Sequence, residues 1–170
     1  GYYPFYKEDV DGFNTRLVEV CRQIIENDIP AVDDVAYATV LKLKKLLMII
    51  AQQVPFIPKM EDLYAQLETS REQGLRLLEL LERGALLGLL KSTVKKIKQM
   101  SSPQKMFLDN TNLVYALHDN PEIGTIRETF FFNQVSRILP INHTKIGDFL
   151  VDEKYIIEVG GADKTFKQIK

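Results

Sequence analysis

The stretch TSREQGLRLLELLERGALLGLL, which runs from Thr69 to Leu90, decides the fold because its hydrophobic pattern changes once along its length. In the first part leucines recur at helical spacing, and Thr69 or Ser70 can accept hydrogen bonds from the free amides of the first turn. The helix should end near Gly84, because glycine is common just after the last helical residue. The short apolar run of residues 85–90 then predicts a β-strand.

The residues before this stretch complete an order of elements. Apolar periodicity predicts helices at about residues 10–27, 34–53 and 60–67, with Pro30 ending the first of them. Two prolines make a rigid turn between the second and third helices. Helix, turn, helix and then a hairpin is a winged-helix order, so residues 1–100 are expected to form a helical, winged-helix-like domain.

The winged-helix interpretation raises the question of nucleic-acid binding. A DNA-reading helix needs basic and amide side chains, but the helix after Ser70 also carries Glu72, Glu79 and Glu82. A formal net charge of −1 gives the chain no overall attraction to nucleic acid, so binding would depend on a local patch. We favour packing or partner docking for this helix and keep base reading as an alternative. The candidate nucleic-acid-binding residues are Arg71, Arg76, Lys91, Lys95, Lys96 and Lys98.

A different pattern begins after Ser101-Ser102-Pro103, which is the best internal boundary in the sequence. The elements expected beyond it are a strand at 105–108, helices at 111–117 and 125–138, and strands near 138–142, 147–151 and 155–159. Residues 152–154 read as the turn between the last two strands. The sequence therefore predicts an α+β protein with a small α/β domain in residues 101–170.

The composition indicates an ordinary globular protein, with 45% hydrophobic and 26% charged residues. The single cysteine, Cys21, lies in an apolar-periodic stretch and is expected to be a buried free thiol. Neither a secretory signal nor an apolar stretch of membrane-spanning length is recognisable. We therefore expect a cytoplasmic protein that does not contact a membrane.

Three carboxylates in the second region are the candidate catalytic groups. Neighbouring strands can bring Asp148 and Glu158 to one face of a sheet, and a helix packed on that sheet can add Glu128. Such oxygen ligands suit Mg²⁺ or Mn²⁺ in a phosphodiesterase, with Asp148 and Glu158 as the metal ligands. A lysine normally stands near the second carboxylate, but Gly160 takes that position here, which leaves Lys164 or Lys167 as a substitute. Structural or solvated carboxylates are the alternative that the residue types favour.

Other cofactor sites are not indicated. The sequence contains no phosphate-binding loop of the pattern Gly-x-x-x-x-Gly-Lys-Ser/Thr, so this chain is not expected to bind ATP by itself. Its two histidines, His118 and His143, show no zinc-ligand spacing with Cys21.

Several motifs in the second region resemble one family in order and spacing. They are KMFLDNTNL at 105–113, GTIRETFF at 124–131, GDF at 147–149, IEVGG at 157–161 and KTFKQI at 164–169. Together with the opening GYYPFY they resemble the C-terminal region of prokaryotic AAA-type ATPases that are known only as ATP-binding proteins. The resemblance covers nearly the whole chain.

This resemblance implies an N-terminal nucleotide-binding domain outside the chain, which would bind ATP and be its partner in the same protein. It also implies a restriction-endonuclease-like fold for residues 101–170, whose site is degenerate because Gly160 replaces the lysine. The expected function is a non-catalytic accessory region that binds a nucleic acid or protein partner and couples it to the motor domain. A divergent metal-dependent nuclease using Asp148 and Glu158 is one alternative, and a winged-helix DNA-binding module is the other.

Overall fold

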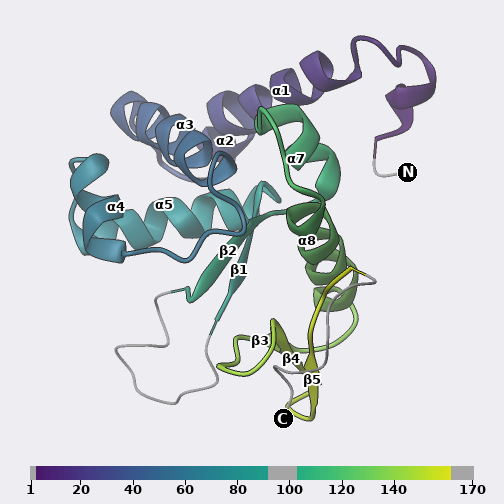
Figure 1. Cartoon of the computed structure of the whole chain (residues 1–170). Coiled ribbons are helices and arrows are strands. Elements are labelled where there is room, and N and C mark those ends of the chain that lie inside the picture. The colour runs from purple at the N-terminus through teal and green to yellow at the C-terminus, as the bar shows by residue number, and fades with distance from the viewer. Residues whose placement is uncertain (1–2, 92–102, 162–170) are drawn as a thin grey trace.

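Helices and short antiparallel strands make up the chain, which the computed structural model describes for residues 3–91 and 103–161 (Figure 1). The first elements are a 3-10 helix at Pro4–Lys7, α1 (Phe13–Gln23), a π-helical turn at Ile24–Asp28, α2 (Ile29–Val32), α3 (Tyr37–Ala51), α4 (Met60–Gln66) and α5 (Arg71–Arg83). They are followed by β1 (Leu87–Leu90), β2 (Lys105–Leu108), α7 (Thr111–Leu117), α8 (Ile123–Ser136), β3 (Ile141–Asn142), β4 (Phe149–Val151) and β5 (Tyr155–Ile157). The predicted α+β class is confirmed.

The first helical segment continues past Pro30, so the prediction that this proline ends it was wrong. A π-helical turn joins α1 directly to α2, and Pro30 lies in the first turn of α2. Proline is accepted there because its ring already has a helical φ and the π-helical turn changes the hydrogen-bond register just before it. Leu17, Cys21 and Ile25 are buried along this segment, and Cys21 is a free thiol as predicted.

The fold-deciding stretch behaves as its pattern indicates. Ser70 caps α5, because its hydroxyl accepts a hydrogen bond from the Gln73 amide over 3.2 Å. The helix ends at Arg83 with Gly84 as its C-cap, and the apolar run that follows forms β1. Four leucines of α5 are buried, and the helix packs against α3, α4 and β1; they are Leu77, Leu78, Leu80 and Leu81.

β1 and β2 form an antiparallel ribbon that is buried on both faces. Leu90 pairs with Lys105 at one end, and Phe56 exchanges two backbone hydrogen bonds with Met106, of 2.9 and 2.7 Å. Successive side chains of a strand point to opposite faces. Met106 accordingly joins the larger hydrophobic cluster, whereas Phe107 joins a smaller one.

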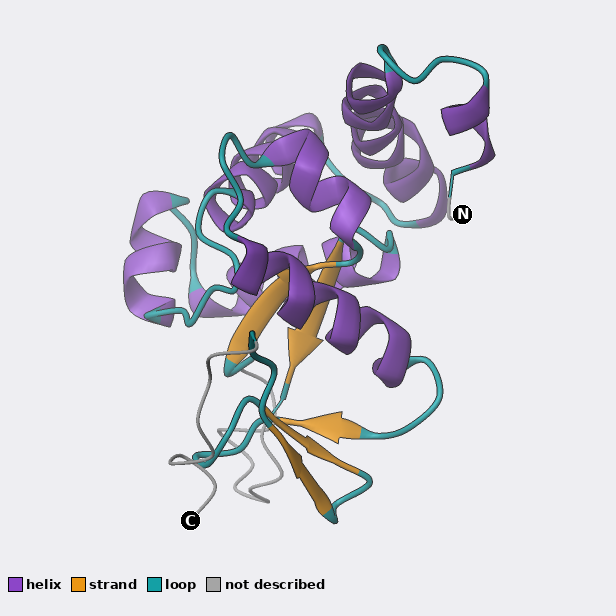
Figure 2. Ribbon diagram, turned by 45° about the vertical axis from the view of Figure 1, so that its right-hand side comes forward, coloured by secondary structure: helices purple, strands orange, loops and turns teal. Residues whose placement is uncertain are grey.

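The two hydrophobic clusters therefore share the ribbon as a common wall. The larger cluster contains side chains of α1, α3, α4, α5 and α7, from Cys21 to Leu117. The smaller cluster lies between the ribbon, α8 and β4, where the Phe107 and Phe132 rings stack with centroids 4.7 Å apart. Figure 2 shows the ribbon between the helices and the strands β3 to β5.

The last three strands form a separate antiparallel sheet in the order β3-β4-β5. Asp152 and Glu153 adopt φ angles of 55° and 54°, and the Lys154 amide donates to the Val151 carbonyl over 3.1 Å. Left-handed residues of this kind give a turn whose twist matches the flanking strands. The turn predicted at residues 152–154 is thereby confirmed, and it fixes Phe149 opposite Ile157.

The ribbon also spans the boundary expected between residues 100 and 101. β1 lies before that boundary, β2 lies after it, and the larger cluster takes side chains from both sides. The division into two domains stays a prediction, and any such division would have to share this ribbon.

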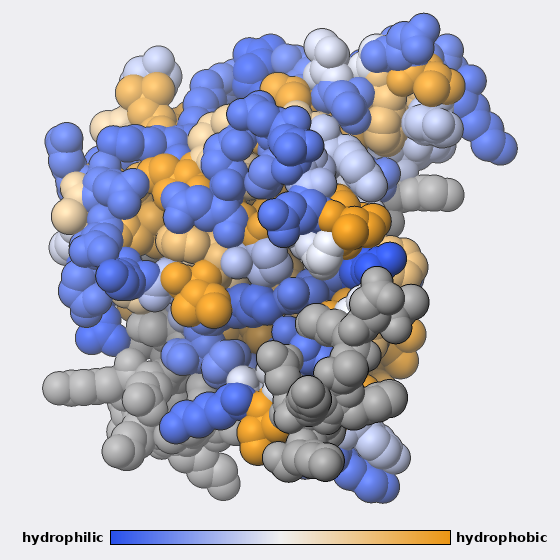
Figure 3. Space-filling model, in the orientation of Figure 1, coloured by the Kyte–Doolittle hydropathy of each residue, from blue (hydrophilic) through white to orange (hydrophobic). Residues whose placement is uncertain are grey.

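The surface of the helical region is mostly hydrophilic in the view of Figure 3, with scattered hydrophobic side chains. None of the helices within residues 3–91 and 103–161 combines the length and the apolar character that crossing a membrane requires.

Candidate functional site

Lys105, Glu128 and Asp148 form a charged cluster beside the smaller hydrophobic cluster. Lys105 begins β2, Glu128 lies on α8, and Asp148 directly precedes β4. The Lys105 ammonium donates a hydrogen bond to Glu128 Oε2 and lies 3.9 Å from Asp148 Oδ1. The three side chains are 12%, 17% and 16% exposed, so the pairing is largely screened from solvent. Two of the carboxylates expected at the site thus meet around one lysine.

Neighbouring groups hold the charged cluster in place. Asp148 Oδ2 accepts a hydrogen bond from the Val159 amide over 2.7 Å, while Oδ1 is the oxygen that lies near the lysine. The Lys105 ammonium also lies 5.4 Å from the Phe107 ring centroid and 5.8 Å from that of Phe149. Aromatic faces attract cations over such distances, so the surroundings of the ammonium are favourable on several sides.

The other residues predicted for this site are placed differently. Glu158 follows β5 directly after Ile157, whose carbonyl accepts a hydrogen bond from the Asp148 amide over 2.9 Å. Within residues 3–91 and 103–161, no three Asp, Glu, His or Cys side chains are grouped as metal ligands. A site formed by Glu128, Asp148 and Glu158 therefore stays a prediction. Lys164 and Lys167 lie outside the described residues.

The charged cluster does not fit a magnesium or manganese ion as it stands. Mg²⁺ requires near-octahedral oxygen ligands at about 2.1 Å. One oxygen of Asp148 already accepts from a backbone amide, and Glu128 and Asp148 both face the Lys105 ammonium. A divalent ion placed there would be repelled by this positive charge. The carboxylates that the structure brings together around Lys105 are Glu128 and Asp148, and metal binding by Asp148 and Glu158 stays a prediction.

His143 lies close to the charged cluster and connects the two sheets. Its backbone amide donates to the Lys91 carbonyl over 2.8 Å, which links the end of β3 to the end of β1. Its Nδ1 atom is buried and makes no hydrogen bond within the described part of the chain. Burial lowers the pKa of His143 below its ordinary value, and the Lys105 ammonium lowers it further. A predominantly neutral imidazole therefore stands beside the lysine near pH 7.

The two arginines predicted on α5 point in different directions. They are five residues apart, which corresponds to about 140° around a helix axis. Arg71 borders a hollow at the start of α4 together with Tyr64, whereas Arg76 borders a groove between α5 and α3. The structure therefore does not place these two candidate nucleic-acid contacts on one face.

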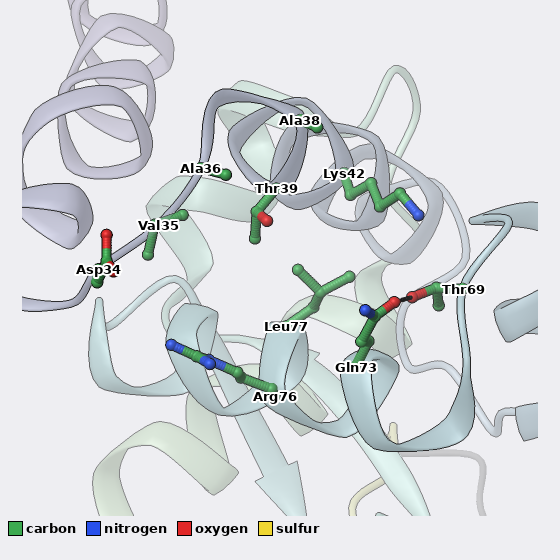
Figure 4. Close-up of a pocket in the computed structure, with 10 residues that line it drawn as sticks. All are labelled: Asp34, Val35, Ala36, Ala38, Thr39, Lys42, Thr69, Gln73, Arg76 and Leu77. Carbon is green, nitrogen blue, oxygen red and sulfur yellow. Dashed lines mark hydrogen bonds between the residues drawn. The ribbon is translucent and has the colours of Figure 1, made fainter.

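The groove beside Arg76 has a volume of about 330 Å³ and a mixed lining (Figure 4). Thr69 donates a hydrogen bond to Gln73 over 2.9 Å at one edge, and Lys42 donates to the Glu68 carbonyl over 2.6 Å. Both signs of charge border it, so it is not a simple anion site. The lining residues are Asp34, Val35, Ala36, Ala38, Thr39, Lys42, Thr69, Gln73, Arg76 and Leu77.

The lysines predicted to contact phosphate lie after β1. Lys91 forms a half-exposed ion pair with Glu82 over 3.4 Å, which is typical of a solvated surface contact. Lys95, Lys96 and Lys98 lie outside the described residues, so their role stays a prediction.

Sequence reasoning missed Lys105, the residue that organises the charged cluster. A charged residue at the start of an apolar strand was visible, but its partner Glu128 stands 23 residues further along the chain. Only the packing of α8 on β2 shows that the two side chains meet.

The charged cluster, the groove and the ribbon are the features from which a function can be inferred. No model of a protein family, no curated protein and no solved structure matches the chain at a significant level.

Proposed function

We propose that this chain is a non-catalytic accessory region of a cytoplasmic AAA-type ATPase. It binds a nucleic acid or protein partner and couples that partner to a nucleotide-binding domain elsewhere in the same protein. The observation that carries the proposal is the order and pairing of α3, α4, α5, β1 and β2.

This order supports the winged-helix interpretation. The helices α3, α4 and α5 precede the antiparallel strands β1 and β2, and the segment between α3 and α4 pairs with β2 through Phe56 and Met106. α5 then takes the place of the helix that contacts the partner in such folds, and its exposed side chains include Gln73 and Arg76. Binding is therefore proposed at α5 and at the connection that follows β1.

The charge on α5 supports docking of a protein more than reading of bases. Glu72 and Glu79 are exposed on the same helix as Arg76, and these acidic side chains would repel the phosphates of a duplex. The lysines at positions 91, 95, 96 and 98 favour nucleic acid, so the partner class has to be decided by measurement.

The region after β2 supports the non-catalytic part of the proposal. We interpret residues 101–170 as a restriction-endonuclease-like domain with a degenerate site, on the basis of Gly160 and the resemblance of its motifs. The pairing of Glu128 and Asp148 with Lys105 is consistent with this interpretation, because it removes carboxylates that a metal would need.

The binding proposal is tested with a fluorescent DNA duplex titrated by the 170-residue chain at low and moderate salt. If the lysines at positions 91, 95, 96 and 98 bind phosphates, the affinity for DNA falls steeply as salt is added. The double variant Lys95→Ala with Lys96→Ala should then lower the slope of log affinity against log salt concentration by about 2. Lys7→Ala removes one charge from the N-terminal 3-10 helix and serves as the control that should leave binding unchanged. Salt-independent or absent DNA binding would assign the surface to a protein partner instead.

A metal-dependent nuclease is the second candidate, because Lys105 contacts Glu128 and Asp148 and could replace the lysine whose expected position is taken by Gly160. The nuclease hypothesis predicts that the wild-type chain cleaves DNA or RNA in the presence of magnesium or manganese and that Glu158→Ala does not. The accessory proposal predicts no cleavage by the wild type or by Glu158→Ala. Hydrolysis of ATP by this chain, or Glu158-dependent cleavage, would overturn the accessory proposal.

A further inference from the structure

We propose that Lys105 is a built-in cation that takes the place a divalent metal ion would occupy between Glu128 and Asp148. Removing its ammonium group should convert the charged cluster into a site for divalent cations. This inference concerns the charged cluster beside the smaller hydrophobic cluster and does not depend on which partner binds α5.

The first support is the position of the ammonium between the carboxylates. Lys105 Nζ lies within 4.0 Å of oxygens from both Glu128 and Asp148, which approach it from α8 and from the start of β4. Two carboxylates with little solvent around them need a compensating cation, because like charges in a partly buried place repel strongly. The lysine provides that charge from a third element of the fold.

The second support is the aromatic surroundings. The rings of Phe107 and Phe149 lie within 5.8 Å of the ammonium, on an otherwise apolar wall. The faces of these rings suit a lysine side chain, because its alkyl stem packs against them and its ammonium group is attracted to them.

The third support is the balance of charge. Lys105 contributes +1 against −2 from Glu128 and Asp148, so the carboxylates are not fully neutralised by the lysine. A divalent ion would neutralise them fully once the ammonium is absent. The hydrogen bond from the Val159 amide keeps Asp148 in place in either case, leaving its Oδ1 atom for a cation.

Lys105→Met is the decisive substitution, because methionine keeps an unbranched apolar side chain while removing the charge. Binding of Mn²⁺ is measured by the loss of the free-ion signal in electron paramagnetic resonance. We expect one new site at about millimolar concentration in Lys105→Met, at least tenfold tighter than any site in the wild type. The double variant Lys105→Met with Asp148→Asn is the matched control and should lose the new site. If Lys105→Met gains no such site, the proposal is wrong.

A second measurement uses the wild-type chain, so that it does not depend on the folding of a variant. In a ¹⁵N-labelled sample, added Mn²⁺ broadens the amide signals of residues near any bound ion. The Val159 amide, which donates to Asp148, should not be broadened selectively. Selective broadening that disappears in Asp148→Asn would show that the carboxylates bind a metal despite Lys105, and would overturn the proposal.

Discussion

Gly88→Ala should destabilise the fold through a single methyl group. A Cβ atom at Gly88 would lie 2.2 Å from Cε1 of Phe132 and within 3.2 Å of two further ring atoms. Carbon atoms normally meet at about 3.5–4.0 Å, so the ring would have to move by more than about 1 Å. It cannot do so freely, because Phe132 is 6% exposed and stacks on Phe107.

The magnitude follows from two opposing effects. Overpacking of a filled core costs about 1–3 kcal/mol, whereas replacing glycine within a strand gains about 0.5–1 kcal/mol. We therefore expect a net loss of about 1–2 kcal/mol in the free energy of unfolding, measured by urea denaturation with circular dichroism. Phe132→Leu should relieve the collision, so that the double variant loses less than the sum of the two single losses.

Gly124→Ala is the matched control for this experiment. Nothing lies within 4 Å of the Cβ that it adds, and Gly124 belongs to α8, so a gain of about 0.5 kcal/mol is expected. An unchanged free energy of unfolding for Gly88→Ala would refute the placement of Phe132 against β1. Equal losses in both variants would attribute the effect to glycine replacement in general.

Two further predictions concern buried titratable groups. Burial raises the pKa of the Cys21 thiol to about 11, so a disulfide reagent near pH 8 should label it slowly in the native chain and promptly in urea; fast native labelling would contradict its burial. His143 has a pKa lowered from 6.5, so the native state binds fewer protons than the unfolded state below that pH. The contribution of His143 to stability should be fully present above about pH 6.5 and should decrease as pH falls towards the lowered pKa. A plot of the urea midpoint against pH should therefore be flatter for His143→Gln than for the wild type. Parallel plots for the two proteins would exclude this contribution.

The elements that sequence patterns predicted well are those with local causes. Ser70 and Gly84 bound α5 because a cap and a C-terminal glycine act within one turn of the helix. β2 and α7 were likewise predicted at their observed bounds, and Asn110 accepts from the Asn112 and Leu113 amides as the cap of α7.

The predictions that were wrong or missing concern features that depend on a change in the helix register or on contacts between residues far apart in the sequence. Pro30 did not end the first helical segment, because a π-helical turn changes the register before it. The partners of Glu128 and Asp148 could not be predicted either, since Lys105 reaches them only through the packing of three elements.

The β1–β2 ribbon disfavours misaligned pairing of its strands, because each of its faces packs against a different cluster. A shift of β2 by one residue against β1 would exchange its two faces, because side chains alternate along a strand. Lys105 would then enter the leucine-rich side, and Met106 would face Glu128 and Asp148 without any charge to offer them. Such a misaligned pairing is penalised twice, once for a charge among apolar side chains and once for carboxylates left without a cation. The observed alignment satisfies both sides, so the register of these two strands links the packing of the helices to that of the C-terminal sheet.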